Sequence, residues 1–187
     1  MNASLIGQLL VASPSLDDPN FARAVVLLLA HGDDGALGII LNRRMGAPVH
    51  EILPQWQYLA LPPAEVFRGG PVAVNSVICL GRVRAGFDFE LVDGFQGTVA
   101  SLFSVDLNRD PDQYGDAITG LRVFSGYAGW SAGQLEVELE QGGWILMPAL
   151  PHDPLTTEPD ELWAAVLRHQ GGLRAAYATA PPNLSLN

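Results

Sequence analysis

The sequence contains no lysine, since all ten of its basic residues are arginine. Without lysine there is no Schiff-base catalysis, no pyridoxal-phosphate attachment and no G-x-x-x-x-G-K-[ST] phosphate loop. A single cysteine, Cys79, excludes an internal disulfide. Because it stands in the apolar run 77–80, we expect a small buried side chain rather than a reactive thiolate.

Metal-binding patterns are also missing. Four histidines, His31, His50, His152 and His169, are widely spaced and form neither C-x-x-C nor H-x-x-x-H patterns. The pair Asp17–Asp18 precedes a proline, where capping of a helical turn explains it more simply than metal binding. The sequence therefore predicts no metal ligands, and no cofactor.

Positive charge is scarce. Twenty acidic residues against ten arginines give a formal net charge of −10. This charge repels a phosphate backbone, so nucleic acid is not an expected partner. The closest basic clusters, Arg43–Arg44 and Arg82–Arg84, are interpreted as surface or ion-paired arginines.

Long apolar runs are absent too. The longest strongly apolar run covers residues 24–30, far fewer than the ~20 residues that a membrane-spanning helix needs. The first residues have neither the basic segment nor the continuous apolar segment of a secretory signal. We therefore expect a cytoplasmic protein without a membrane anchor.

What the chain does contain is typical of a folded α+β domain. Hydrophobic residues make up 48% of its 187 positions, and no linker or repeat divides them. We expect one domain over residues 1–187, with an ordered core at about 4–178 and a short tail at 179–187. Apolar patterns and turn residues predict strands over 4–12, 24–30, 36–42, 66–68, 72–83, 87–92, 121–127 and 144–148. They predict helices within 48–59, 108–119, 131–141 and 159–170.

Three blocks carry a family resemblance: GQLLVASPSLDDPNFARAVVLLLAHGDDGALGIILNR at 7–43, RGGPV at 68–72 and FSGYAGWSAGQLEVELEQGGW at 124–144. In order and spacing they resemble the YqgE/AlgH family. The resemblance implies a mixed, bifurcated β-sheet folded into a pseudo-barrel flanked by short helices. It implies no established activity, although one branch is named for regulation of exopolysaccharide synthesis, which points to a regulatory role.

The stretch GWSAG at 129–133 matches the G-x-S-x-G pattern of serine hydrolases. Chain order would allow Ser131 to act with an acid such as Asp153 or Asp160 and with His169. A capping box is the favoured interpretation: Ser131 would accept from the N–H of Gln134, and the Gln134 side chain would reciprocate. The family resemblance supports this choice, because its block does not require serine here. We predict no catalytic residue, and the acidic residues at 136, 138 and 140 are interpreted as a solvated helix face.

Two interpretations remain open for the aromatic residues of the third block. Tyr127 and Trp130 would either lock a strand-to-helix joint or, with Gln134, form one wall of a ligand pocket. In the second case Asn42, Arg43 and the backbone of Gly69 and Gly70 would lie nearby. Arg43 would then present its planar guanidinium to a carboxylate or phosphate.

The sequence thus favours a non-enzymatic binding or regulatory domain that acts through a small molecule or a protein partner. A serine hydrolase using Ser131 is the first alternative, and a DNA-binding transcriptional regulator is the second.

Overall fold

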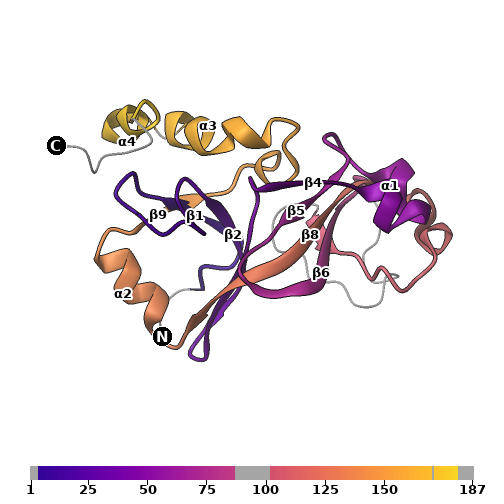
Figure 1. The fold of residues 1–187 in the computed structure, drawn as a ribbon, viewed down its shortest axis with the longest axis horizontal. Coiled ribbons are helices and arrows are strands. Elements are labelled where there is room, and N and C mark those ends of the chain that lie inside the picture. The colour runs from indigo at the N-terminus through magenta and orange to yellow at the C-terminus, as the bar shows by residue number, and fades with distance from the viewer. Residues whose placement is uncertain (1–3, 87–101, 170, 181–187) are drawn as a thin grey trace.

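The computed structural model describes residues 4–86, 102–169 and 171–180 (Figure 1). Its strands are β1 (Gln8–Ala12), β2 (Val25–Gly32), β3 (Gly35–Ile40), β4 (Arg44–Pro48), β5 (Glu65–Arg68), β6 (Val72–Val83), β7 (Leu102–Ser104), β8 (Ile118–Ser131) and β9 (Trp144–Pro148). Its α-helices are α1 (Val49–Ile52), α2 (Gln134–Glu140), α3 (Leu162–His169) and α4 (Gly172–Tyr177). Short 3₁₀ helices are η1 (Pro54–Leu59), η3 (Pro111–Ala117), η4 (Asp153–Leu155) and η5 (Pro159–Glu161).

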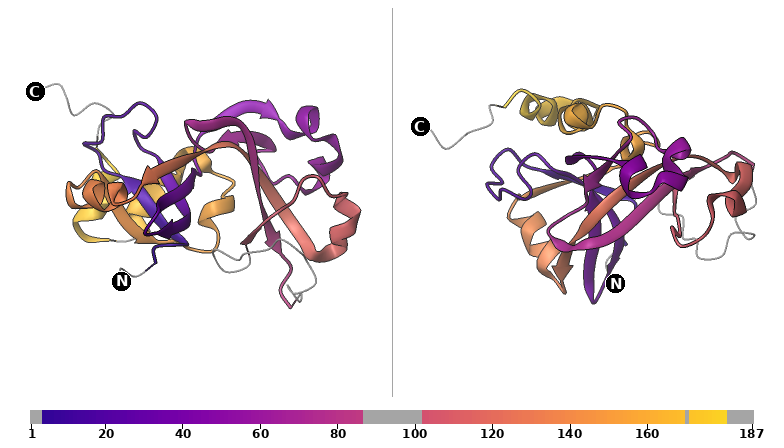
Figure 2. Two further views of the ribbon diagram at one scale, coloured as in Figure 1. Left: turned by 90° about the horizontal axis from the view of Figure 1, so that it is seen from below. Right: turned by 45° about the vertical axis from the view of Figure 1, so that its right-hand side comes forward.

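The described strands form one mixed sheet that divides at β8. One branch runs β8-β3-β2-β1-β9, and the other places β5 and β4 on one side of β8 and β6 and β7 on the other. β5 pairs with β8 in parallel, whereas the other named strand pairs of the described residues are antiparallel. Figure 2 shows β8 passing from one part of the molecule into the other. The predicted α+β class with a mixed, bifurcated sheet is confirmed, and the path of described strands does not close into a complete barrel.

The first branch is buried on both faces because its strands alternate between two hydrophobic clusters. Leu9, Val11, Val25 and Leu27 pack with α3, while the residues between them pack with α2 and Trp144. In Figure 1, α3 lies on one side of β1 and β9 and α2 on the other. This explains why residues 24–28 are continuously apolar, as a strand covered on both faces requires, whereas Ala30 near the end of β2 is exposed.

The second branch encloses its own cluster, in which Trp56 and Tyr114 from the 3₁₀ helices cover β6 and β8. Cys79 of β6 lies in this cluster and is 1% exposed. Burial raises the pKa of its thiol well above the ordinary value, so the reactive thiolate is suppressed. The expected small buried side chain is confirmed.

Labelling of Cys79 should therefore depend on unfolding. We expect a thiol reagent such as 5,5′-dithiobis(2-nitrobenzoic acid) to react with the native protein roughly 1,000-fold more slowly than with the denatured protein, since access requires opening of the core. Stopped-flow absorbance with and without guanidinium chloride measures the ratio. Similar rates in both conditions would contradict the burial of this residue.

Most predicted strands are found close to their expected bounds, and the differences have local causes. Residues 4–7 precede β1 rather than extending it, because a turn ends at Gly7, which has a φ of 80°. The helix expected within 108–119 is the 3₁₀ helix η3, and the strand expected at 121–127 is longer at both ends. β4 and β7 were not predicted. The strand expected at 87–92 and tail residues 181–187 lie outside the described residues.

The helix expected from Ser131 begins later, so Ser131 is not its N-cap. Ser131 instead ends β8, where it is paired with Gly35 of β3. Gly133, in the left-handed region with φ 74°, turns the chain into α2. No described helix is long and apolar enough to cross a membrane.

Candidate functional site

A pocket of about 360 Å³ lies where β3, β4 and β5 end or begin. It is lined by Pro19, Asn20, Arg43, Arg44, Met45 and Arg68. Two backbone contacts hold its strands together: Arg68 N–H donates to Arg43 C=O at 2.8 Å, and Arg44 pairs with Phe67. These contacts bring three arginines that are separated in sequence to one opening, which we call the arginine pocket.

Asn42 directly precedes the pocket residue Arg43 and is not among the residues that line the pocket. It is 7% exposed, accepts from Val25 N–H at 3.0 Å and donates to Arg23 C=O at 2.9 Å. Both contacts are to backbone, so Asn42 fixes the turn that follows β3. These contacts of its side chain fix the backbone from which Arg43 projects.

Arg43 is the half-buried cation of the pocket. Its guanidinium donates to the carbonyl of Ala22, and burial lowers the pKa of Arg43 from its ordinary value. The guanidinium has five N–H donors, so this single contact leaves donors for another acceptor. A desolvated cation of this kind gains most from an anion placed beside it.

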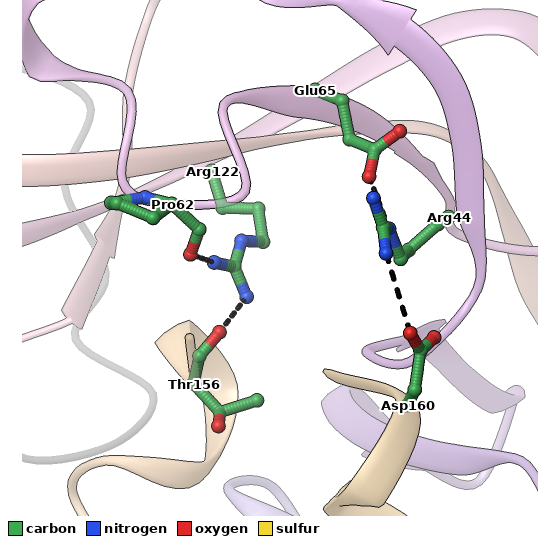
Figure 3. A network of polar contacts seen from close by, with 6 residues as sticks. All are labelled: Arg44, Pro62, Glu65, Arg122, Thr156 and Asp160. Atoms are coloured by element: carbon green, nitrogen blue, oxygen red, sulfur yellow. Dashed lines mark hydrogen bonds and ion pairs between the residues drawn. The ribbon is translucent and has the colours of Figure 1, made fainter. Parts of the chain in front are cut away.

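Arg44 is already paired with acids on both sides (Figure 3). Its guanidinium donates to Glu65 and, at 3.3 Å, to Asp160. These two carboxylates, Glu65 first, hold the pKa of Arg44 above its ordinary value. Glu65 is buried, whereas the Asp160 side chain is 69% exposed and forms a weak, screened contact.

Arg68 is the exposed cation of the pocket. Among the described residues no carboxylate forms an ion pair with its guanidinium. The three guanidinium groups of the pocket therefore outnumber the two carboxylates that form ion pairs with them. Three arginines at one opening stand in contrast to the net charge of −10 of the whole chain.

Gly69 and Gly70 were expected near the site, and the structure gives them a structural task. A Cβ on Gly69 would lie 2.2 Å from Gly126 O, and one on Gly70 would lie 2.1 Å from the carbonyl group of Tyr127. Both glycines thus allow the chain after β5 to cross closely over β8. Both glycines hold the strand ends in place. The backbone of Gly69 is also fully hydrogen-bonded, since its C=O accepts from Ile40 N–H and its N–H donates to Ser125 C=O.

Trp130 and Gln134 belong to a second polar network, centred on Glu138. One carboxylate oxygen of Glu138 accepts from Trp130 Nε1 at 2.9 Å and from Trp144 Nε1 at 2.8 Å, and the other accepts from Gln134 Nε2 at 2.9 Å. Phe21 packs against both indoles. Glu138 is therefore the hydrogen-bond partner of two buried indoles. The interpretation of residue 138 as part of a solvated helix face was wrong.

Tyr127 is partly buried against the central cluster of the first branch. Of the residues expected in one pocket, the structure brings Asn42, Arg43 and Gly69 together at the strand ends. Tyr127, Trp130 and Gln134 do not line the arginine pocket. Their contacts correspond to the first of the two open interpretations, a locked strand-to-helix joint.

Ser131 is engaged by Gln134. Gln134 Oε1 accepts from both the N–H and the hydroxyl of Ser131 at 3.1 Å, so one half of the expected capping box is present. All four histidines lie within the described residues, and none of them is hydrogen-bonded to Ser131 Oγ. His31, for example, contacts Glu136 at 2.9 Å. The base that would activate a serine nucleophile is not beside this hydroxyl.

Two of the three arginines of the arginine pocket were not predicted as site residues from the sequence. Arg44 was interpreted as a surface or ion-paired arginine, which its contacts with Glu65 and Asp160 agree with, but not as a pocket residue. Arg68 was not considered, since only the pairing of β4 with β5 brings it to Arg43. The available signal was positional: Arg43–Arg44 and Arg68 each stand at the end of an apolar strand pattern. Charged residues at strand ends face a common edge once those strands pair.

Comparison with known proteins gives a consistent match over nearly the whole chain. A family model described as AlgH-like matches residues 9–175. A UPF0301 protein of Streptomyces coelicolor is 45% identical over 186 residues, covering 99% of this chain and 96% of that protein. A UPF0301 protein of Mycobacteroides abscessus is 41% identical over 181 residues, covering 97% and 87%.

Two solved structures share the fold. The crystal structure of protein DIP2367 from Corynebacterium diphtheriae superposes with a TM-score of 0.89 at 32% identity, covering 96% of this chain and 94% of that one. The solution structure of the AlgH protein from Pseudomonas aeruginosa gives a TM-score of 0.67 at 31% identity, covering 97% of each.

Proposed function

Since the chain belongs to the AlgH-like family, and the names of these relatives state no activity, we propose from its geometry that it is a binding domain for a small anion. The ligand carries phosphate or carboxylate groups and is held by Arg43, Arg44 and Arg68. Binding would serve the regulatory role in the cytoplasm that we expected from the sequence.

The observation that carries this function is that three arginines line one pocket in a chain with twice as many acids as bases. Guanidinium forks match phosphate and carboxylate oxygens and bind them with two parallel hydrogen bonds. The volume of about 360 Å³ lies within the usual range for small-molecule sites. The exposed Arg44–Asp160 contact would open at little cost to admit an anion.

A larger groove, of about 830 Å³, lies between the segment after β1, β9 and α4. Its lining includes one charged residue, Arg174, and the hydroxyls of Ser13 and Ser15 contact each other at 2.9 Å. Such a lining offers few converging groups to orient a ligand. The arginine pocket is therefore the better candidate.

Arg68→Gln should weaken anion binding. Loss of one charged donor costs about 1.5 kcal/mol or more, so we expect the Kd to rise at least roughly tenfold. Isothermal titration calorimetry with pyrophosphate and citrate at low ionic strength measures the change. The wild-type affinity should also fall as salt is added, because the partly exposed charges are screened.

Arg109→Gln is the matched control, since Arg109 is a partly exposed arginine whose only described ion pair is with Asp106. It should leave the Kd unchanged, and circular dichroism should show that both variants remain folded. Absence of binding by the wild-type protein, or an equal effect of both substitutions, would remove the arginine pocket as the site.

A further inference from the structure

A second cluster of ligand-type side chains lies at the opposite end of the sequence. His152 and Asp153 stand at the start of η4, and His169 is the last residue of α3. One imidazole nitrogen from each histidine and one carboxylate oxygen all lie within 4.8 Å of one another. The fold thus brings together residues whose spacing along the chain gave no metal-binding pattern.

Asp153 is held in a fixed orientation. It is 2% exposed, and its Oδ2 accepts from Leu150 N–H at 2.7 Å. Its other oxygen, Oδ1, lies 3.5 Å from His152 Nε2, a distance too long for a good hydrogen bond. Oδ1 accepts no hydrogen bond from the described residues, so its lone pairs are available to a cation.

The two histidines complete an open set of ligands. Both are exposed, and their rings lie edge to face with centroids 6.0 Å apart. Two imidazoles and one carboxylate are the donors that Zn²⁺ and its neighbours in the first transition row accept, whereas Mg²⁺ and Ca²⁺ prefer oxygen alone. The hydrogen bond from Leu150 orients the carboxylate, as outer partners do in metal sites.

The three ligand atoms need to approach one another only slightly to reach the distances of a metal site. Ligand atoms about 2.1 Å from a tetrahedral metal lie about 3.4 Å apart, compared with the observed limit of 4.8 Å. Rotation of the two exposed imidazoles toward the fixed Asp153 supplies this change. Three protein ligands would leave the fourth position to water.

We propose that His152, Asp153 and His169 bind one divalent transition-metal ion, of which Zn²⁺ is the probe of choice. The site is independent of the arginine pocket. A bound ion would link the start of η4 to the end of α3.

Isothermal titration of the metal-stripped, tag-free chain with ZnCl₂ tests the site. We expect one Zn²⁺ per chain, and we expect His152→Ala and His169→Ala each to raise the Kd at least tenfold. Asp153→Asn, which keeps an oxygen for the hydrogen bond from Leu150, should raise it similarly. Binding of Co²⁺ should give the visible absorption of a nitrogen- and oxygen-ligated ion, and this signal should be lost in the same variants.

His50→Ala is the control, because His50 is an exposed histidine of α1 outside the cluster. It should bind Zn²⁺ as the wild type does. Circular dichroism of each variant without metal separates loss of the site from loss of the fold. No binding by the wild-type chain, or equal binding by the His152, His169 and His50 variants, would overturn the proposal and leave His152 and Asp153 as an ion pair.

Discussion

Arg122→Ala is expected to lower the free energy of unfolding by about 3–5 kcal/mol, among the largest effects of any single substitution in this chain. Arg122 lies on β8 and is 2% exposed. Its guanidinium donates to Thr156 C=O at 2.6 Å and to Pro62 C=O at 2.8 Å (Figure 3). It therefore joins the sheet to the segments around Pro62 and Thr156, neither of which belongs to a named strand.

The charge of Arg122 is stabilised from several directions. Its guanidinium carbon lies 4.5 Å from the centroid of the Phe67 ring, which allows a cation–π interaction. The negative charge of the Glu65 carboxylate also attracts the guanidinium and favours its protonated form. Burial lowers the pKa of Arg122 to about 10, so the group remains protonated at neutral pH. Truncation to alanine would leave a cavity and two carbonyls without donors, and these two costs add.

Urea denaturation followed by circular dichroism measures the free energy of unfolding. Two further variants serve as a control and as a test of the hydrogen bonds. Arg109→Ala, at a partly exposed position, should change the free energy of unfolding by less than about 1 kcal/mol. Arg122→Met fills most of the volume without donating to the carbonyls. If this variant were as stable as the wild type, the hydrogen bonds of Arg122 would make no net contribution.

Gly70→Ala should prevent folding or lower the free energy of unfolding by about 4 kcal/mol or more. The added Cβ would lie 2.1 Å from the carbonyl carbon and oxygen of Tyr127 and 2.4 Å from Ala128 N. These are backbone atoms of β8, so no side-chain rotation relieves the overlap. The chain after β5 would have to move away from β8, which breaks the edge where Arg68 enters the arginine pocket.

Gly129→Ala is the control because Gly129 lies on β8, the strand that Gly70 crosses, and has room for a Cβ. Its new Cβ would meet the Tyr127 ring at 3.6 Å, an ordinary contact distance. This variant should express as a folded protein and change the midpoint of thermal unfolding by only a few degrees. Equal stability of the two variants would contradict the close crossing at Gly70.

The strands were largely predictable because their signals are local. Residues 24–30 and 72–83 are apolar or β-branched runs between turn residues, and both form strands close to those bounds. The start of α2 was not predictable in this way. Ser131 stays in β8 because it pairs with Gly35, and nothing in the neighbouring residues indicates that long-range pairing. β4 was missed because Gly46 and Pro48 are unfavourable in isolated strands.

The sites depend even more on long-range contacts. Arg43 was identified because it ends the first of the three family blocks, but its companion Arg68 arrives through the pairing of two strands. His152 and His169 meet because α3 returns along the sheet to η4. The role of Glu138 as acceptor for two indoles required knowledge of where Trp144 lies. Composition and spacing could indicate which chemistry the chain offers, but not which groups meet.

The length of β8 has a consequence for how the protein unfolds. This strand pairs with β3 near its end at Ser131 and with β5 and β6 over its earlier residues, so both branches of the sheet depend on it. Disorder in either branch would remove hydrogen-bonded partners from a strand that the other requires. The two branches are thus expected to behave as one cooperative folding unit rather than as separate foldons, despite their separate hydrophobic clusters.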